Sequence, residues 1–281
     1  MWFDVPVINE FSSGHLSGVA GMIHDVAAAE TMPRFRQLVG GEIAEKRGPH
    51  DLVTVADRIA EERLAAGLIA LLPGSAVVGE ESVYADAGVL GALSGDEPVW
   101  IVDPIDGTRL FVQGDLGFTT LVCLAHRGES LASWTYAPGL GLMAVARRGG
   151  GAVLNGEPLR CGSPDPGKHL EVSITHPDFT TEQQKRTLAA LSTGDITSHP
   201  CVSSGWDYLE VARGSLDAVA FTWENAWDHA AGLLLVAEAG GVSATVADEP
   251  FRIAGGNTLP FGAARDEATL RRVLAPLAAA C

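Results

Sequence analysis

Two carboxylates and a turn follow an apolar run in the stretch 100–108, Trp-Ile-Val-Asp-Pro-Ile-Asp-Gly-Thr. Pro104 has no N–H to give to a sheet ladder and Gly107 permits a tight turn, so we expect a short buried strand that ends near Asp103. Asp103 and Asp106 would then project from one strand end, beside the backbone N–H groups of the turn. Such a group suits a divalent cation together with a phosphate, because hard cations take oxygen ligands and exposed N–H groups bind anions. Two consecutive surface turns are the alternative, since Asp-Pro and Asp-Gly are common there.

The composition describes an ordinary folded protein with a strong negative charge. Of 281 residues, 47% are hydrophobic and 19% are charged, and a chain of this length buries about three quarters of its unfolded surface. The net charge of −16 repels nucleic-acid backbones and acidic membranes, so neither is an expected partner. A small phosphorylated metabolite would also be repelled unless bound cations reverse the local sign.

The cysteines and the N-terminal segment predict a cytoplasmic location. Cys123, Cys161, Cys201 and Cys281 are widely spaced and form no C-x-x-C pair, which disfavours structural zinc and is typical of free thiols in a reducing compartment. The N-terminal segment shows no basic region followed by an apolar run. No stretch of about 18 apolar residues occurs in the chain.

The stretch 100–108 resembles the signature of the inositol monophosphatase family, the magnesium-dependent, lithium-sensitive phosphatases of sugars and polyols. Further segments resemble other elements of that family, in the family's order, so the resemblance spans most of the chain. These segments are Asp51–Asp57 with Lys46 upstream, Gly79-Glu80-Glu81, the pattern from Asp207 to Asp217, and Trp227–Gly232.

Each of these segments has an ordinary structural interpretation when it is taken alone. Asp57 is favoured at a helix N-terminus, Glu80 and Glu81 suit a solvated turn, and Asp228 suits a helix N-cap. Agreement of all the segments by chance is improbable.

The resemblance implies a site with two or three Mg²⁺ ions, with Mn²⁺ as the other possible ion. Acidic oxygen ligands without cysteine or paired histidine favour these ions over zinc or copper. Glu80, Asp103 and the carbonyl of Ile105 would hold one ion. Asp103, Asp106 and Asp228 would hold another.

The resemblance also implies hydrolysis by a metal-activated water, with metals about 3.5–4 Å apart as in such sites generally. Thr108, hydrogen-bonded to Asp57 and assisted by Glu80, would orient and deprotonate the water, and no covalent phosphoenzyme is expected. The N–H groups of Gly107 and Thr108 would neutralise phosphate charge while the second ion stabilises the departing alkoxide. The implied substrate-binding residues are Asp106, Gly107, Thr108, Ser203, Ser204 and Asp228.

The substrate pocket departs from the inositol-hydrolysing members. Those enzymes carry a Glu seven residues before the last metal Asp, where it contacts a ring hydroxyl, but this chain has Phe221 there. The family's Gly-Ser-Ala-Ala stretch is replaced by Val202–Gly205. Glu224 is a candidate to take the place of the missing acid, and Trp206 and Asp207 are further candidates for the pocket wall.

Several substrates and one other class of function therefore stay open. The expected substrate is a small sugar or polyol phosphate resembling inositol 1-phosphate. Histidinol phosphate, fructose 1,6-bisphosphate and an adenosine bisphosphate are alternatives within the superfamily, and a non-catalytic metal-binding regulator is the alternative outside enzymes. The resemblance also implies a homodimer.

Strands that alternate with helices predict a layered arrangement, and the resemblance implies an α/β (α+β) fold, a layered αβαβα sandwich of the sugar phosphatase type. The chain would form one unit with approximate lobes 1–161 and 162–281. Expected helices cover 12–32, 51–72, 180–191, 203–213, 226–239 and 267–277. Expected strands cover 76–79, 100–103, 118–125, 130–136, 142–147, 171–175, 197–202 and 218–223, with a hairpin at Asn155-Gly156 and edge strands within 241–250 and 259–264.

Overall fold

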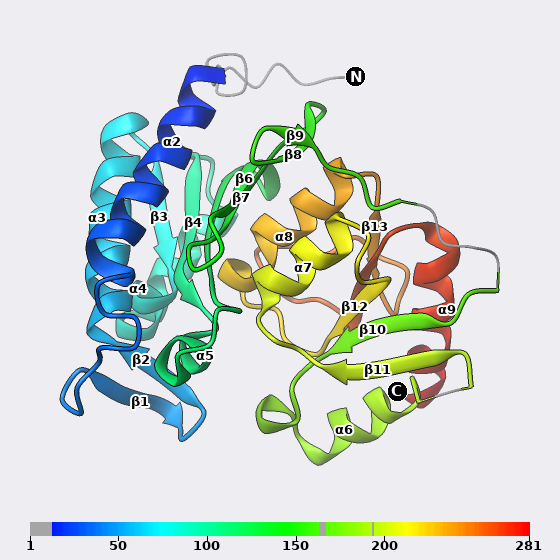
Figure 1. Cartoon of the computed structure of the whole chain (residues 1–281). Coiled ribbons are helices and arrows are strands. Elements are labelled where there is room, and N and C mark those ends of the chain that lie inside the picture. Colours follow the sequence, from blue (N-terminus) through cyan, green and yellow to red (C-terminus); the bar gives the residue numbers. More distant parts are fainter. Residues whose placement is uncertain (1–12, 163–166, 193) are drawn as a thin grey trace.

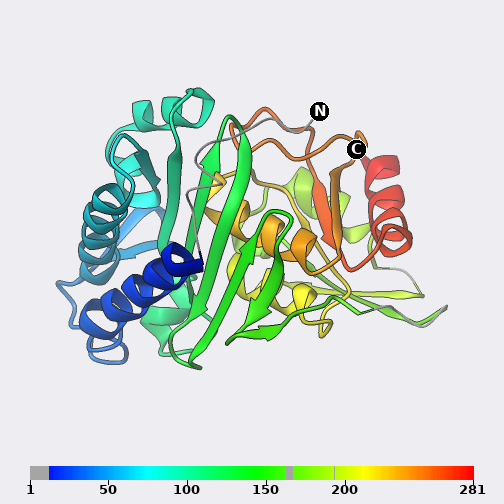
Figure 2. The same ribbon diagram turned by 90° about the horizontal axis from the view of Figure 1, so that it is seen from above.

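A computed structural model describes residues 13–162, 167–192 and 194–281, and it shows alternating layers of helix and sheet (Figures 1 and 2). Helices α2 (Ser13–Val26) and α3 (Val55–Leu71) form the first layer, followed by a seven-stranded sheet. Helices α7 (Ser204–Ala212) and α8 (Ala226–Glu238) lie in the middle. A five-stranded sheet and an outer layer with α6 (Glu182–Ala189) and α9 (Glu267–Ala280) complete the molecule. The predicted layered α/β fold is confirmed.

The seven-stranded sheet carries the stretch 100–108 next to its edge. Its order is β3-β4-β5-β6-β7-β8-β9, with β3 and β4 parallel and every later neighbour antiparallel. Its strands are β3 (Ala76–Gly79), β4 (Val99–Asp106), β5 (Thr119–His126), β6 (Glu129–Ala137), β7 (Leu142–Arg147), β8 (Gly151–Leu154) and β9 (Glu157–Pro158).

The five-stranded sheet has the order β11-β10-β12-β14-β13. Its strands are β10 (Leu170–Ile174), β11 (Ile196–Pro200), β12 (Ala218–Phe221), β13 (Val242–Thr245) and β14 (Phe261–Ala264). The prediction that 259–264 forms an edge strand is wrong, because β14 pairs with β12 on one side and with β13 on the other. All four residues of β14 are buried, which is typical of an interior strand.

Apolar side chains fill each gap between layers. Ile23, Leu64 and Leu68 of the first helices pack against Trp100 and Trp134 of the larger sheet. The middle helices contact both sheets: one cluster joins α7 and α8 to strands β7, β8, β12 and β14, and another joins α8 to strands β3, β4 and β5. The outer helices α6 and α9 cover the far face of the smaller sheet.

Three local elements differ from their predicted bounds. The helix expected from Asp51 begins only at Val55, because Asp51–Thr54 forms strand β2 against β1 (Ile43–Gly48). Strand β4 continues past Pro104 to Asp106, with a break in its register against β5 between the two aspartates. The first helix is described from Ser13, since residue 12 lies outside the described residues, and it passes into a short π-helix at Ala27–Thr31 within the predicted range.

The hairpin at Asn155-Gly156 is confirmed. Both residues adopt positive φ, 50° and 87° respectively, as the two central residues of a type I′ turn require. Residues 163–166, just after the predicted boundary between the lobes, lie outside the described residues, and the division at residue 161 stays a proposal. None of the helices in the described ranges has the length and apolar character that a membrane span needs.

The close approach of the two middle helices depends on Gly232 of α8. A Cβ at this position would lie 2.0 Å from Cδ2 of Tyr208, which is wholly buried on α7. Such an overlap forces the helices apart, and the N-termini of both helices reach the acidic side chains described below.

We therefore expect Gly232→Ala to destabilise the protein by about 1–3 kcal/mol, as overpacking of a filled core does, although alanine favours helix. Gly18→Ala is the matched control, since Gly18 is exposed on α2 and a Cβ there meets nothing within 4 Å. The control should gain stability by up to about 1 kcal/mol. Urea denaturation measures both, and equal stabilisation of the two variants would contradict this account of the interface.

Candidate metal and phosphate site

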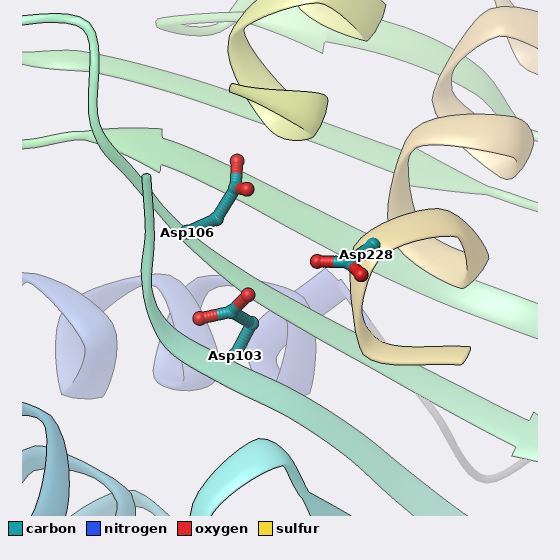
Figure 3. A group of neighbouring side chains, drawn as sticks. All are labelled: Asp103, Asp106 and Asp228. Carbon is teal, nitrogen blue, oxygen red and sulfur yellow. The ribbon is translucent and has the colours of Figure 1, made fainter. Parts of the chain in front are cut away.

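Three carboxylates from two separate elements meet beside the end of strand β4 (Figure 3). One oxygen each of Asp103, Asp106 and Asp228 lies within 4.8 Å of the other two. Asp103 and Asp106 belong to β4, and Asp228 lies in the first turn of α8. Asp103 and Asp106 are buried, and Asp228 is half-buried. The fold thus brings together three of the side chains that the sequence singled out.

The end of β4 is shaped by its own polar side chains. Asp103 Oδ1 accepts a hydrogen bond from the N–H of Ile105 at 3.0 Å, and Thr120 Oγ1 donates to the carbonyl of Pro104 at 2.8 Å. Gly107 follows with φ of 85°, a conformation that glycine adopts without strain. The chain then enters helix α5 (Thr108–Gln113).

Asp106 is held by four hydrogen bonds from neighbouring elements. Thr119 Oγ1 and the N–H of Gly205 donate to its Oδ2 at 2.8 and 2.7 Å, while the N–H and the hydroxyl of Ser204 donate to its Oδ1 at 3.2 and 3.0 Å. Glycine is required at 205, because a Cβ there would lie 2.3 Å from Thr119 Oγ1. Ser203 caps α7 and donates to the carbonyl of Gly117 at 2.9 Å. Ser203 and Ser204, which the resemblance assigns to substrate, therefore also fasten α7 to the larger sheet.

Asp228 is oriented by two residues that the sequence did not single out. Trp223 Nε1 and Asn225 Nδ2 both donate to Asp228 Oδ2, at 2.7 and 3.0 Å. Both bonds depend on the conformation of the loop between β12 and α8, and no spacing of residues in the sequence predicts that conformation. Both hydrogen bonds therefore end on the same oxygen, Oδ2, and neither involves Oδ1.

Glu80 lies in the wall of the same cavity but is paired with a lysine. Lys46 Nζ donates to Glu80 Oε1 at 2.7 Å and to Glu81 Oε1 at 2.5 Å. Glu80 is not part of the group of three aspartates, although its charge raises the pKa of Asp103 and of Asp228.

Glu61 of α3 positions the glutamates and was missed by sequence reasoning. It accepts hydrogen bonds from the N–H groups of Glu81 and Ser82, both at 2.8 Å, at the start of α4 (Glu80–Ala85). A signal was present, because Glu61 falls on the buried face of α3, one helical turn after Asp57. A Cβ at Gly79 would lie 2.2 Å from the Glu61 carboxyl carbon, so that carboxylate fills the space beside the strand end.

Asp57 links a helix start to Thr108. The N–H and hydroxyl of Thr54 donate to Asp57 Oδ2 at 2.8 and 2.5 Å, which makes Asp57 part of the N-terminal cap of α3. Its other oxygen accepts from Thr108 Oγ1 at 3.0 Å, and the carbonyl of Ile105 lies 2.9 Å from the same hydroxyl. The capping interpretation and the predicted contact with Thr108 both hold.

Burial and mutual repulsion dominate the electrostatics of the aspartates and Glu80. Burial raises the pKa of Asp103 and Asp228 well above the usual range, and the neighbouring carboxylates raise it further. Burial also raises the pKa of Asp57 to about 6 and that of Glu80 to about 7, against the opposing effect of Lys46 on each. Within the described residues, no lysine, arginine or histidine forms an ion pair with the three aspartates. Buried carboxylate oxygens that repel one another are suitable ligands for a hard divalent cation, because the cation supplies the missing positive charge.

The cavity over these acids measures about 540 Å³ and is large enough for a small metabolite. Its wall includes Gly107, Thr108, Ser203 and Ser204, four of the residues that the resemblance assigns to substrate. Trp206, Asp207 and Glu224 are not among its lining residues. Glu224 accepts hydrogen bonds from the N–H and the side-chain amide of Asn257, at 2.8 and 2.9 Å, and so does not replace the acid that is missing at Phe221.

Comparisons with known proteins find a matching family and related sequences. The model of the "Inositol monophosphatase family" matches residues 18–275. An inositol monophosphatase of Dictyostelium discoideum is 32% identical over 206 residues, 70% of this chain and 73% of the relative. An inositol-1-monophosphatase of Mesorhizobium japonicum is 32% identical over 248 residues, 83% and 86% of the two chains.

Other matching relatives have different names. A "fructose-1,6-bisphosphatase/inositol-1-monophosphatase" of Thermotoga maritima is 31% identical over 71% of this chain and 73% of its own. A "Nus factor SuhB" of Pseudomonas aeruginosa is 32% identical over 76% and 81%.

The fold is shared with solved structures as well. The IMPase of Thermotoga maritima superposes with a TM-score of 0.78 and covers 95% of this chain and 98% of its own, at 23% identity. The family model matches nearly the whole described chain, and both inositol monophosphatases align with more than two thirds of it. The chain belongs to the inositol monophosphatase family.

Proposed function

We propose that the protein is a magnesium-dependent phosphatase that hydrolyses the phosphate monoester of a small alcohol, in the size range of a sugar or polyol phosphate. The observation that carries this proposal is the group of Asp103, Asp106 and Asp228, three acids packed together and joined in no ion pair to a lysine, arginine or histidine of the described residues. Membership of a family of phosphomonoesterases supports the same reaction.

The acids would hold two or three Mg²⁺ ions, or Mn²⁺ in their place. Glu80, Asp103 and the carbonyl of Ile105 are the proposed ligands on one side, and Asp103, Asp106 and Asp228 on the other. Bound magnesium supplies Lewis-acid activation of water and neutralisation of phosphate charge. The Thr108 hydroxyl has a single proton and gives it to Asp57 in this arrangement, so the Ile105 carbonyl, 2.9 Å from that hydroxyl, keeps its lone pairs for an ion.

The chain's own groups bind the phosphate and orient the water. Thr108 Oγ1 donates toward Asp57, so its lone pairs can accept a hydrogen bond from a water molecule in the cavity. Asp57 and Glu80 are the proposed proton acceptors behind that water, and their raised pKa values lie near the working range of a general base. The N–H groups of Gly107 and Thr108 would donate to the phosphate oxygens, while Ser203, Ser204, Asp106 and Asp228 border the rest of the substrate.

A regulator without catalytic activity is the second candidate. It is favoured by one observation, the similarity to a relative named Nus factor SuhB. Retention of every proposed ligand favours the enzyme, because a chain that no longer needs catalysis has no reason to keep repelling acids together. Phosphate release from a panel of sugar and polyol phosphates, with and without Mg²⁺, separates the candidates.

We further propose that the protein works in the cytoplasm as a homodimer. The cysteines Cys123, Cys161 and Cys201 are buried and Cys281 is exposed, and all four are free thiols, which suits a reducing compartment. The dimer rests on the family resemblance, and sedimentation of the purified protein measures it.

Asp103→Asn should lower kcat by at least about 100-fold, the usual loss when one preorganised electrostatic group is removed. The variant keeps the size of the side chain and removes one charge shared by both sides of the site. Phosphate release in Mg²⁺ is the measurement, and Asp25→Asn, at an exposed carboxylate of α2, is the control. Near-normal turnover by Asp103→Asn would refute the assignment.

Magnesium should raise the melting temperature more at pH 8 than at pH 5.5. The raised pKa values of Asp57, Glu80, Asp103 and Asp228 mean that the folded, metal-free protein holds protons more tightly than the unfolded chain. The contribution of Asp57 and Glu80 to stability is therefore fully present below about pH 4, the range of unfolded carboxyls, and is lost as the pH rises through about 6 and about 7, respectively. The contribution of Asp103 and Asp228 is lost in the same direction, as the pH rises.

The cation restores this lost stability only when its ligands are ionised, which explains the pH dependence. Differential scanning fluorimetry at both pH values, with Mg²⁺ and with EDTA, gives the shift. The Asp103→Asn variant should show a smaller shift at pH 8. An equal shift at both pH values in the unmodified protein would mean that the ion binds elsewhere.

A further inference from the structure

We propose that the alcohol released from the substrate carries a planar aromatic or heteroaromatic ring, and that this ring binds against Phe179 and Arg109 at the mouth of the cavity. The inference rests on the proposed phosphatase function, because that function fixes the phosphate at the acidic end of the same cavity. Arg109 directly follows Thr108, so the subsite adjoins the proposed phosphate position.

Phe179 is a large apolar ring left open to water inside a functional cavity. Its exposed fraction is 52%, and it lines the cavity from the short helix Pro177–Phe179. The guanidinium carbon of Arg109 lies 5.6 Å from its ring centre. The imidazole rings of His50 and His176 approach it edge-on, with centroid distances of 6.5 and 6.1 Å. A set of planar groups from three separate segments therefore surrounds one exposed phenyl face.

The residues around Phe179 present planar surfaces to the cavity and carry little net charge. Arg109 Nη1 donates to Asp178 Oδ2 at 2.7 Å, and His50 and His176 lie 3.7 and 3.4 Å from the same oxygen. Asp178 thus offsets the charge of Arg109 and holds the guanidinium in place over Phe179. An arginine that is already paired is a weak receptor for a second phosphate, but its flat face still stacks on an aromatic ligand.

The carboxylate that suits a polyol ring is missing at position 221. Phe221 is wholly buried and stacks on His229, with centroids 5.7 Å apart. Glu224 is engaged by Asn257, away from the cavity. Trp223 stands in the wall, and its indole N–H is used by Asp228. The nearby wall is therefore formed by Trp223 and Trp227, whereas Phe221, at the position where the resemblance places a carboxylate in the inositol-hydrolysing members, does not line the cavity.

Two matched pairs of substrates test the proposal with Mg²⁺ present. Adenosine 5′-monophosphate is compared with ribose 5-phosphate, and histidinol phosphate with phosphoethanolamine, because the members of each pair differ mainly in the ring. Inositol 1-phosphate is included as the polyol. In at least one pair we expect kcat/KM to be about tenfold or more higher for the ring-bearing member, the usual effect of one stacking contact.

Phe179→Leu keeps an apolar side chain but removes the ring. It should bring the ratio within the favoured pair close to one, while kcat/KM for the ringless member stays within about twofold. Leu140→Ala, at an exposed apolar residue that does not line the cavity, is the matched control and should leave the ratio unchanged.

Three results would overturn the subsite: equal kcat/KM within both pairs, a preference for inositol 1-phosphate over all ring-bearing compounds, or a ratio that Phe179→Leu does not change. If the protein is not a phosphatase, the result differs from all three of these, since no compound would then release phosphate. In that case, calorimetric dissociation constants for the same pairs decide the subsite alone. Tighter binding of the ring-bearing members would support it, and equal binding would reject it.

Discussion

The repulsion among buried carboxylates is the constraint on which the rest of the structure depends. Asp103, Asp106 and Asp228 would separate if they were free to move, because each loses hydration on burial and each faces like charges. The surrounding elements prevent that movement. Four hydrogen bonds hold Asp106, two hold Asp228, and the backbone of Ile105 holds Asp103. Stability is therefore given up locally so that a cation finds its ligands already in place.

The layered fold makes this arrangement possible. The middle helices begin at the end of strand β4, so the N-terminus of α7 reaches Asp106 and the first turn of α8 supplies Asp228. Both helices are fixed by apolar contact with two sheets at once. A helix between two sheets has little freedom to shift, which suits a site whose ligands come from distant parts of the chain.

The sequence predicted those parts of the site that lie in contiguous motifs. The strand–turn–helix stretch around Asp103 and the acids at Asp57, Glu80 and Asp228 were all identified from residue types and a family resemblance, as was the alternation of strands and helices. Contacts that depend on the tertiary structure could not be predicted from the sequence. Trp223 holds Asp228 through a loop geometry that no spacing encodes, and the partner of Glu224 lies more than thirty residues away.

The strand errors have a similar cause. A short apolar strand such as β14 reads the same whether it lies at an edge or between two neighbours, because its place depends on long-range pairing. Pro104 was expected to end β4, but a proline can be accommodated where the ladder is already irregular, as it is between Asp103 and Asp106.

The positive charge that the protein supplies is distributed unevenly around the site. Lys46 lies between Glu80 and Glu81 and offsets one of their two charges, so that side of the cavity is partly balanced by the protein. The aspartates have no such partner among the described residues. A divalent cation therefore lowers the free energy most beside Asp103, Asp106 and Asp228, whereas on the Glu80 side it competes with a lysine whose pKa those glutamates raise. One cavity thus combines a side that depends on an external cation with a side whose charge the protein itself offsets in part.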